Sequence, residues 1–264
     1  MNEAPLGVFD SGIGGLTVAR ALFERLPLES VIYFGDTARV PYGPKSPDTV
    51  RRYSGEILAY LITRGVKAVV VACNTSTAHA LSYLQERSSV PVVGVIEPGA
   101  RAAVAATRTG TIGVIGTAGT IASGAYERAI TALRPDARVH SQPCPLFVPL
   151  VEEGWFEHPA AELIAREYLA PLQRATVDVV VLGCTHYPLL KPLLARVMGP
   201  DVTLVDSAEE TATAVSRELE RLHLLASGGA HDHRFVVSDD EPHFRKVGAR
   251  FLGEKLKQVE VVPL

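Results

Sequence analysis

Long hydrophobic runs, disulfide spacings and blocks of like charge are all missing from this sequence, and each absence excludes a class of protein. Its longest apolar stretches are well below the ~20 residues that cross a bilayer, and no basic and apolar leader precedes the first expected strand. Three cysteines, Cys73, Cys144 and Cys184, lie far apart without a Cys-x-x-Cys pair, which favours unpaired thiols in a reducing compartment. We therefore expect a cytoplasmic protein that has no membrane partner.

Nucleic-acid, nucleotide and metal sites also lack their usual signals. The net charge is −3 at pH 7 and the arginines form no basic run, which argues against nucleic acid as the main partner. The glycine-rich turn 10–15 lacks the third glycine of a dinucleotide fingerprint and the lysine of a P-loop, and could cradle a carboxylate instead. His231 and His233 have no third ligand nearby, so we expect no metal site.

What the sequence does contain is one cysteine at the end of each of two similar strands. Residues 69–73 are Val-Val-Val-Ala-Cys, and residues 180–184 are Val-Val-Leu-Gly-Cys. Each apolar run is typical of a buried parallel strand, and the residues after each cysteine can cap a helix. Ligands bind at the carboxyl ends of such strands, and a helix N-terminus lowers the pKa of a nearby thiol. We expect Cys73 and Cys184 at one ligand site, and Cys144 as a small buried hydrophobic residue.

Four segments recur in the same order in the two halves of the chain, which indicates an internal duplication. The spacing from the first glycine to the cysteine is similar, 66 residues from Gly7 to Cys73 and 71 residues from Gly113 to Cys184. The matched segments are 7–11 with 113–117, 31–33 with 137–139, Cys73 with Cys184, and 95–97 with 204–206. Chance resemblance between apolar strands explains the valines but not the ordered polar residues that follow them.

Apolar periodicity predicts alternating strands and helices, which is typical of parallel sheets with helices on both faces. The expected strands are 6–9, 30–34, 68–72, 92–96, 111–115, 138–141, 177–182, 202–205, 234–237 and 259–262. The expected helices are 16–24, 46–64, 77–86, 97–106, 122–133, 159–172, 189–197, 208–225 and 241–252. We expect an α/β fold of two pseudo-duplicated parallel-sheet domains, 1–97 plus 207–264 and 98–206, with the active site in the cleft between them.

Two thiols that face each other across a small site suit stereochemical inversion at a carbon that carries a proton. One thiolate removes the proton from one face and the opposite thiol returns a proton to the other. We expect Cys73 and Cys184 as the two bases, with Asp10, Glu152 and His186 as partners that accept or orient protons. Because a buried carboxylate raises the pKa of a thiol beside it, Asp10 would act as a relay or orient a substrate ammonium.

Five motifs in order resemble the glutamate racemases of the cofactor-independent aspartate/glutamate racemase superfamily. They are GVFDSGIGG at 7–15, PYG at 41–43, ACNT at 72–75, GTAGT at 116–120 and GCTH at 183–186, and the resemblance extends from Gly7 to about Phe251. The turn 10–15 favours glutamate racemases over aspartate or hydantoin racemases. The family uses no pyridoxal phosphate, which agrees with six lysines of which none lies in a motif typical of a Schiff base.

The resemblance implies interconversion of L- and D-glutamate without a cofactor, which supplies D-glutamate for peptidoglycan. It implies that Cys73 acts with Asp10 on one face of the substrate, and Cys184 with His186 and Glu152 on the other. The substrate-binding residues that it implies are Asp10, Ser11, Tyr42, Gly43, Asn74, Thr75, Thr117, Thr120, Thr185 and His186. Members are commonly homodimers, so we expect glutamate and a second copy of the chain as partners.

Three alternatives remain open. The preference for glutamate over aspartate depends on pocket geometry, which motif spacing does not fix. A cysteine hydrolase with Cys184 as nucleophile and His186 as base would leave Cys73 without a role. A two-domain protein that binds an amino acid without chemistry would need neither thiol.

Overall fold

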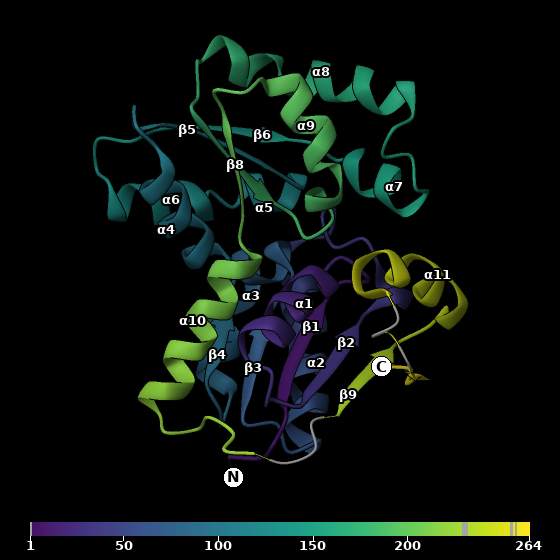
Figure 1. Ribbon diagram of the computed structural model, residues 1–264. Helices are drawn as coiled ribbons and strands as arrows, with labels where there is room; N and C mark the ends of the chain where they lie inside the picture. The colour runs from purple at the N-terminus through teal and green to yellow at the C-terminus, as the bar shows by residue number, and fades with distance from the viewer. Residues whose placement is uncertain (1, 229–231, 254–255, 257) are drawn as a thin grey trace.

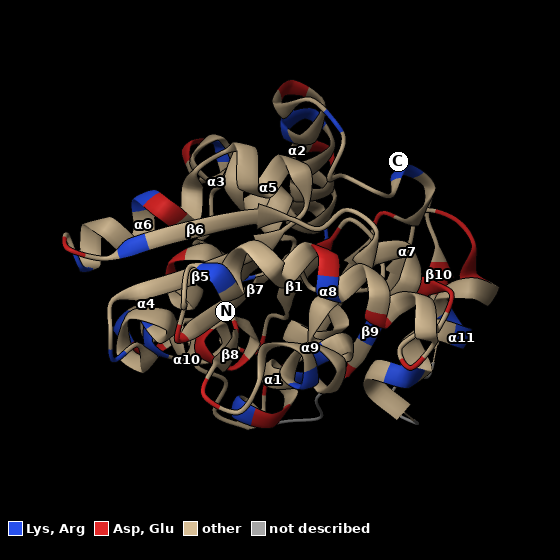
Figure 2. Ribbon diagram, turned by 90° about the horizontal axis from the view of Figure 1, so that it is seen from above, with Lys and Arg blue, Asp and Glu red and all other residues tan. Residues whose placement is uncertain are grey.

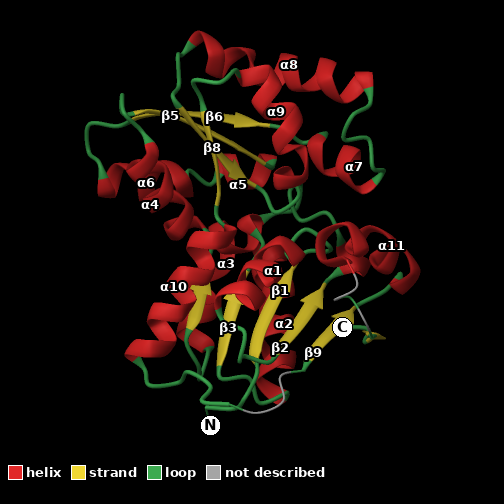
Figure 3. Cartoon of the chain, viewed as in Figure 1, coloured by secondary structure: helices red, strands yellow, loops and turns green. Residues whose placement is uncertain are grey.

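The computed structural model describes residues 2–228, 232–253, 256 and 258–264, in which strands and helices alternate along the chain (Figures 1 and 3). The first half contains β1 (Leu6–Asp10), α1 (Leu16–Arg25), β2 (Val31–Gly35), η1 (Thr37–Arg39), α2 (Pro47–Thr63), β3 (Ala68–Val71), α3 (Asn74–Arg87), β4 (Val92–Gly94) and α4 (Ile96–Ala106). The second half contains β5 (Thr111–Gly116), α5 (Ala118–Ala122), α6 (Ala125–Leu133), β6 (Arg138–Pro143), α7 (Phe147–Glu152), α8 (Pro159–Arg174), β7 (Val179–Gly183), η2 (Tyr187–Leu190), α9 (Lys191–Met198) and β8 (Thr203–Asp206). The tail contains α10 (Ala208–Arg221), β9 (His233–Val237), α11 (Glu241–Leu252) and β10 (Val259–Val261).

The strands form two parallel sheets, which confirms the predicted fold class. The six-stranded sheet has the order β10-β9-β2-β1-β3-β4, and the four-stranded sheet has the order β6-β5-β7-β8. The order β2-β1-β3-β4 in the first sheet therefore recurs as β6-β5-β7-β8 in the second, and every neighbouring pair is parallel. The repeated strand order is what an internal duplication produces.

Helices cover both faces of the first sheet, and this is why its inner strands β1, β2 and β3 are apolar at almost every position. Side chains alternate between the two faces of a strand, so Val8 and Val70 belong to one hydrophobic cluster while Phe9 and Val71 belong to another. All four side chains are fully buried. The carboxyl ends of these strands point toward the second sheet (Figures 1 and 3).

The tail returns to the first sheet. Strand β9 pairs with β2, and β10 pairs with β9, so residues from the end of the chain extend the sheet that begins at Leu6. The boundaries predicted at 97/98 and 206/207 stay a proposal, which the division of strands between the two sheets supports. We call residues 1–97 plus 207–264 the first unit and residues 98–206 the second unit. His231, considered above as a metal ligand, lies outside the described residues.

Three helices differ from the predicted pattern. Helix α3 begins at Asn74 rather than Thr77, because Cys73 itself caps it: the Cys73 thiol accepts from Ser76 N at 3.4 Å. The helix predicted at 122–133 is two helices, separated at Gly124, which has a left-handed φ of 64°. Helix α7, with only six residues and Pro149 inside it, has too little periodicity to be read from the sequence.

Charges are spread over the outer elements of the molecule. Seen from above, Lys and Arg alternate with Asp and Glu along the helices and do not gather on one element (Figure 2). None of the helices in the described part of the chain combines the length and the apolar character that a bilayer crossing needs.

Candidate active site

Cys73 and Cys184 line one cavity at the junction of the two sheets. Cys73 follows β3 and Cys184 follows β7, so the two thiols lie at the carboxyl ends of strands that occupy matching places in the two sheets. The cavity has a volume of about 20 Å³, on the order of one water molecule. Its lining residues are Ser11, Val40, Pro41, Tyr42, Gly43, Cys73, Asn74, Thr75, Thr117, Val148, Cys184, Thr185 and His186.

Most of the predicted site residues are among them. Asp10, Thr120 and Glu152 are not: each lies behind a lining residue and contacts it by a hydrogen bond. Cys144 is fully buried and does not line the cavity, in keeping with its predicted structural role. The apolar lining residues Val40 and Val148 were missed, because a lone valine carries no motif.

The Cys73 thiol is 5% exposed and neutral over a wide pH range. Burial raises the pKa of Cys73 to about 11, and the negative charge of Asp10 acts in the same direction. Hydrogen bonds from Ser76 at the start of α3 lower the pKa of Cys73, as the sequence led us to expect, but burial and Asp10 raise it by more. The expectation that the helix N-terminus would lower the pKa of this thiol is therefore wrong in the net result.

Cys184, His186 and Glu152 form a line of contacts. Cys184 Sγ lies 3.9 Å from His186 Nδ1, and His186 Nε2 lies 3.1 Å from Glu152 Oε1. Burial alone would lower the pKa of His186, but its contacts with Cys184 and Glu152 raise that pKa to about 10. Burial likewise opposes ionisation of Glu152, yet the hydrogen bond to His186 lowers its pKa overall. His186 is therefore positioned as an imidazolium beside the Cys184 sulfur.

Asp10 joins the two units. Its carboxylate is fully buried at the end of β1 and accepts from Gly12 N at 3.0 Å within the glycine-rich turn. It also accepts from the Thr185 hydroxyl of the second unit at 3.2 Å. Burial raises the pKa of Asp10 above its ordinary range, although His186 and the backbone hydrogen bonds of the turn act in the opposite direction. Asp10 thus lies between both cysteine loops, and not beside Cys73 alone.

Three threonines meet where the two units touch. The Thr75 hydroxyl lies 2.9 Å from that of Thr117 and 3.2 Å from that of Thr120, which are themselves 3.0 Å apart. Close by, Gly119 N donates to Gly43 O at 2.9 Å across the junction. Hydroxyls both donate and accept, so this cluster can rearrange to bind a carboxylate.

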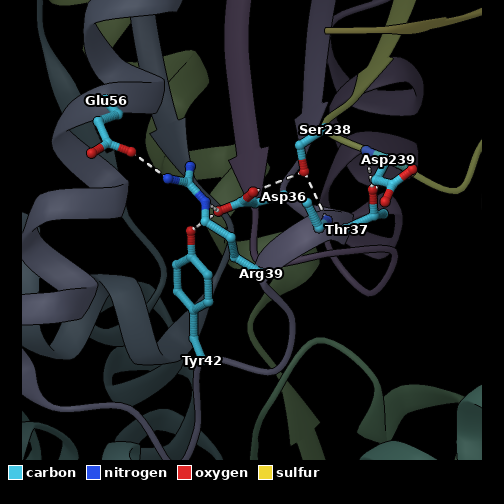
Figure 4. Close-up of polar contacts among 8 residues, drawn as sticks. Asp36, Thr37, Arg39, Tyr42, Glu56, Ser238 and Asp239 are labelled. Carbon is cyan, nitrogen blue, oxygen red and sulfur yellow. Dashed lines mark hydrogen bonds and ion pairs between the residues drawn. The ribbon is translucent and has the colours of Figure 1, made fainter. Parts of the chain in front are cut away.

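A buried network holds the segment that carries Tyr42 and Gly43. Asp36 accepts from Arg39 Nε at 2.7 Å and from the Ser238 hydroxyl at 2.8 Å, and it also accepts from the Tyr42 hydroxyl. Figure 4 shows Asp36 between Tyr42 on one side and Ser238 on the other. Tyr42 therefore lines the cavity with its hydroxyl already paired, and the tail of the chain supports this side of the site. Sequence reasoning missed Asp36, which no motif connects with Ser238.

No group of three or more His, Cys, Asp or Glu side chains that could hold a metal ion occurs within the described ranges. The site is instead built from two thiols, their titratable neighbours and several hydroxyls.

Comparison of the sequence with known proteins identifies a family and close relatives. The sequence matches the Asp/Glu/Hydantoin racemase family over residues 16–215. A glutamate racemase from Geobacter metallireducens is 55% identical over 260 residues, which cover 98% of this chain and 96% of that protein. This chain belongs to the Asp/Glu/Hydantoin racemase family.

Solved racemases of the family have the same architecture over their whole length. The glutamate racemase isoform RacE1 from Bacillus anthracis has a TM-score of 0.94 and 42% identity, covering 100% of this chain and 98% of its own. The glutamate racemase from Francisella tularensis, solved in complex with D-glutamate, has a TM-score of 0.94 and 39% identity, covering 99% and 98%. Within the family, the chain is thus an isomerase of the glutamate racemase group.

Proposed function

We propose that this protein interconverts L- and D-glutamate by proton transfer between the substrate α carbon and two cysteines, without a cofactor. The observation that carries the proposal is the placement of Cys73 and Cys184. Both are buried, both follow matching strands of the two sheets, and both line one cavity. A base on each side of the α carbon turns deprotonation into inversion, because the returning proton reaches the opposite face.

The two thiols differ in the groups that surround them. Because the pKa of Cys73 is raised to about 11, this thiol keeps its proton near neutral pH and suits the role of proton donor in the free enzyme. The His186 imidazolium, held by Glu152, balances negative charge on Cys184 when that thiol has lost its proton. Inversion in either direction therefore places a proton on one thiol as the other gives one up, and His186 is the cation beside Cys184 in both directions.

Glutamate is the substrate that the relatives support. Curated relatives above 50% identity are glutamate racemases, whereas an aspartate racemase with a similar fold is only 15% identical. The α-carboxylate and side-chain carboxylate would be bound by the hydroxyl and backbone donors of Ser11, Thr75, Thr117 and Thr185. The product D-glutamate would serve peptidoglycan synthesis in the cytoplasm.

One contact favours a second candidate function. Cys184 Sγ and His186 Nδ1 are 3.9 Å apart, which is the kind of pairing that a cysteine hydrolase uses. This alternative gives Cys73 no task, and it predicts that Cys73→Ala keeps full activity and that a covalent acyl-enzyme accumulates.

The deciding experiment follows L-glutamate in deuterated buffer without added cofactor. We expect optical rotation to decay to zero while deuterium enters the α carbon. Cys73→Ala and Cys184→Ala should each lower the racemisation rate by about 10²- to 10⁴-fold, the usual effect of losing an acid or base. Cys144→Ala, which removes a buried thiol outside the cavity, is the matched control and should retain racemisation. Exchange with aspartate but not glutamate would change the substrate, and no exchange with either would overturn the proposal.

We further propose that the protein forms a homodimer in solution. Light scattering on the purified chain should give a mass of twice 28.3 kDa, whereas a mass of 28.3 kDa would identify a monomer.

A further inference from the structure

One tyrosine outside the cavity contacts the loops of both cysteines. Tyr126, near the start of α6, is 3% exposed. Its hydroxyl donates to Asn74 Oδ1 at 2.7 Å, and Asn74 directly follows Cys73. Its ring packs against Gly183, which directly precedes Cys184: a Cβ placed on Gly183 would lie 3.0 Å from Tyr126 Cε2. A single side chain of the second unit thus touches both thiol-bearing segments.

The same side chain lies where the chain passes between the two units. A Cβ placed on Gly99, in helix α4, would be 3.1 Å from the Tyr126 hydroxyl. Ser207, which directly precedes α10, hydrogen-bonds to Tyr126 through its side chain. Burial raises the pKa of the Tyr126 phenol, and this hydrogen bond lowers it in part. Helices α4 and α6 lie side by side on one flank of the molecule (Figure 1). Tyr126 therefore contacts Asn74 as well as the two segments where the chain crosses between the units, so a shift of one unit against the other would also move the partner of Asn74.

The hydrogen bond fixes the orientation of a side chain that lines the cavity. Asn74 is 3% exposed, and its amide oxygen is occupied by the Tyr126 hydroxyl. An amide has one acceptor oxygen and one NH2 group with two donors, so the NH2 group is left for whatever enters the cavity. A donor at this place suits a carboxylate and does not suit an ammonium.

We propose that Tyr126 is a positioning residue for racemisation, which holds the Asn74 amide with its NH2 group toward a substrate carboxylate. The inference rests on the proposed racemase function and adds to it a residue that no substrate contact would identify. A purely apolar packing role would be filled equally well by phenylalanine. The buried hydroxyl, by contrast, has a defined partner, and that partner lines the site.

The first test is a double-mutant cycle on kcat/KM for L-glutamate. Tyr126→Phe keeps the ring on Gly183 and removes only the donor to Asn74, so we expect kcat/KM to fall about tenfold, the effect of one lost hydrogen bond to a paired amide. In an Asn74→Ala background the same change should cost less than about twofold, because the group through which Tyr126 acts is gone. Equal costs in both backgrounds would show a structural role and overturn the proposal.

A matched control removes the same hydroxyl elsewhere in the second unit. The Tyr168 hydroxyl in α8 is hydrogen-bonded to the backbone of Leu146, and Tyr168 does not line the cavity. Tyr168→Phe should leave kcat/KM within about twofold of the unmodified protein, in line with a single hydrogen bond that does not reach the site.

A second variant keeps the proposal testable if Tyr126→Phe folds poorly. Gly99→Ala places a methyl group 3.1 Å from the Tyr126 hydroxyl, 3.2 Å from Ser207 Cβ and 3.3 Å from Tyr126 Cε1, so Tyr126 must shift within its site and its hydrogen bond to Asn74 is disturbed. Alanine favours a helix more than glycine does, so α4 should become no less stable while kcat/KM falls several-fold. Combining Gly99→Ala with Tyr126→Phe, which removes the nearest crowded atom, should add little to the loss that Tyr126→Phe causes alone. Unchanged kcat/KM in Gly99→Ala would count against the proposal.

Failure of this inference and failure of the proposed function give different results. If the unmodified protein does not racemise glutamate, the proposed function is refuted, and the role of Tyr126 in racemisation is refuted with it. If the unmodified protein racemises glutamate and Tyr126→Phe matches Tyr168→Phe, only the role of Tyr126 is refuted.

Discussion

Burial and a few neighbours set the charge of each side chain at the site. For Cys73, burial and Asp10 outweigh the hydrogen bonds at the start of α3, so the pKa rises to about 11 and the thiol stays neutral. For His186, Cys184 and Glu152 outweigh burial, so the pKa rises to about 10 and the imidazole stays charged. A raised pKa thus keeps the Cys73 thiol neutral on one side of the cavity and keeps the His186 imidazole positively charged on the other.

His186 should make the stability of the protein pH-dependent. Its pKa is raised from 6.5 to about 10 in the folded state, so its stabilising contribution is complete below pH 6.5 and is lost as the pH rises toward 10. We expect the free energy of unfolding in urea to fall between pH 6.5 and 8. His186→Gln should remove most of that fall, measured below pH 8, because cysteine in the unfolded chain, with an ordinary pKa of about 8.5, is still mostly protonated there. Parallel curves for the two proteins would contradict the assignment of the cation to His186.

Asp10 should control the acidity of Cys73. Because the Asp10 charge contributes to the raised pKa of Cys73, Asp10→Asn should make Cys73 titrate at a lower pH than in the unmodified protein. Asparagine can still accept from Gly12 N with its amide oxygen, and its NH2 group can donate to the Thr185 hydroxyl once that hydroxyl rotates, so the local geometry should be retained. The measurement is the pH dependence of iodoacetamide labelling of the Cys73 peptide by mass spectrometry. The unmodified protein, labelled over the same pH range, is the reference, and an unchanged Cys73 profile would refute the electrostatic effect.

Among the elements, the glycine-rich turn between β1 and α1 lets the two units approach closely. The turn passes directly over the loop that follows β7, and no room exists for a side chain at Gly14. A Cβ placed there would lie 2.3 Å from the Thr185 hydroxyl and 2.5 Å from His186 Nδ1. Glycine at this position therefore serves close approach between units, not a left-handed backbone.

Gly14→Ala should damage activity far more than folding. The added methyl group must displace Thr185 and His186, so we expect kcat/KM to fall at least about 10²-fold, comparable to the misplacement of an acid–base group. Gly12→Ala is the matched control, because a Cβ at that position meets only Val40, at 3.3 Å. Thermal unfolding of both variants checks that the fold is retained. Similar activities for the two variants would show that the contact between the turn and the second unit is unimportant.

Over the whole molecule, the two units close on a cavity of about 20 Å³. A five-carbon amino acid needs several times the space of one water molecule, so the units must separate before glutamate binds. The contacts that must break are hydrogen bonds and close packing between the units, including Gly119 N to Gly43 O and Thr75 to Thr117. We infer that opening is part of each catalytic cycle.

Hydrogen exchange should detect this opening. The Gly119 amide is bonded across the junction, whereas the Ala72 amide is bonded to Phe9 O within the first sheet. Opening of the junction exposes Gly119 without unfolding the sheet, so Gly119 should exchange much faster than Ala72. Glutamate should slow exchange at Gly119 and leave Ala72 unchanged. Equal rates at the two amides, with no effect of glutamate, would indicate that the units do not separate.

Local signals explain why so much of the fold was predictable. The strand ending before Cys73 and the strand ending before Cys184 are continuous apolar segments, and such segments predict buried parallel strands wherever they occur. Less local features were missed. Asp36 and Ser238 are separated by 202 residues, and Tyr126 reaches Asn74 across 52 residues, so neither contact leaves a pattern in the sequence.

By itself, the sequence determined the α/β class, the internal duplication and the pairing of one thiol with each half, because periodicity and motif order are properties of neighbouring residues. The tertiary structure alone decided that Cys73 keeps its proton near neutral pH, how small the closed cavity is, and how Tyr126 connects the two cysteine loops. Charge states depend on burial, and burial is a sum over atoms from segments far apart in the chain. That sum exists only once the two units have packed together.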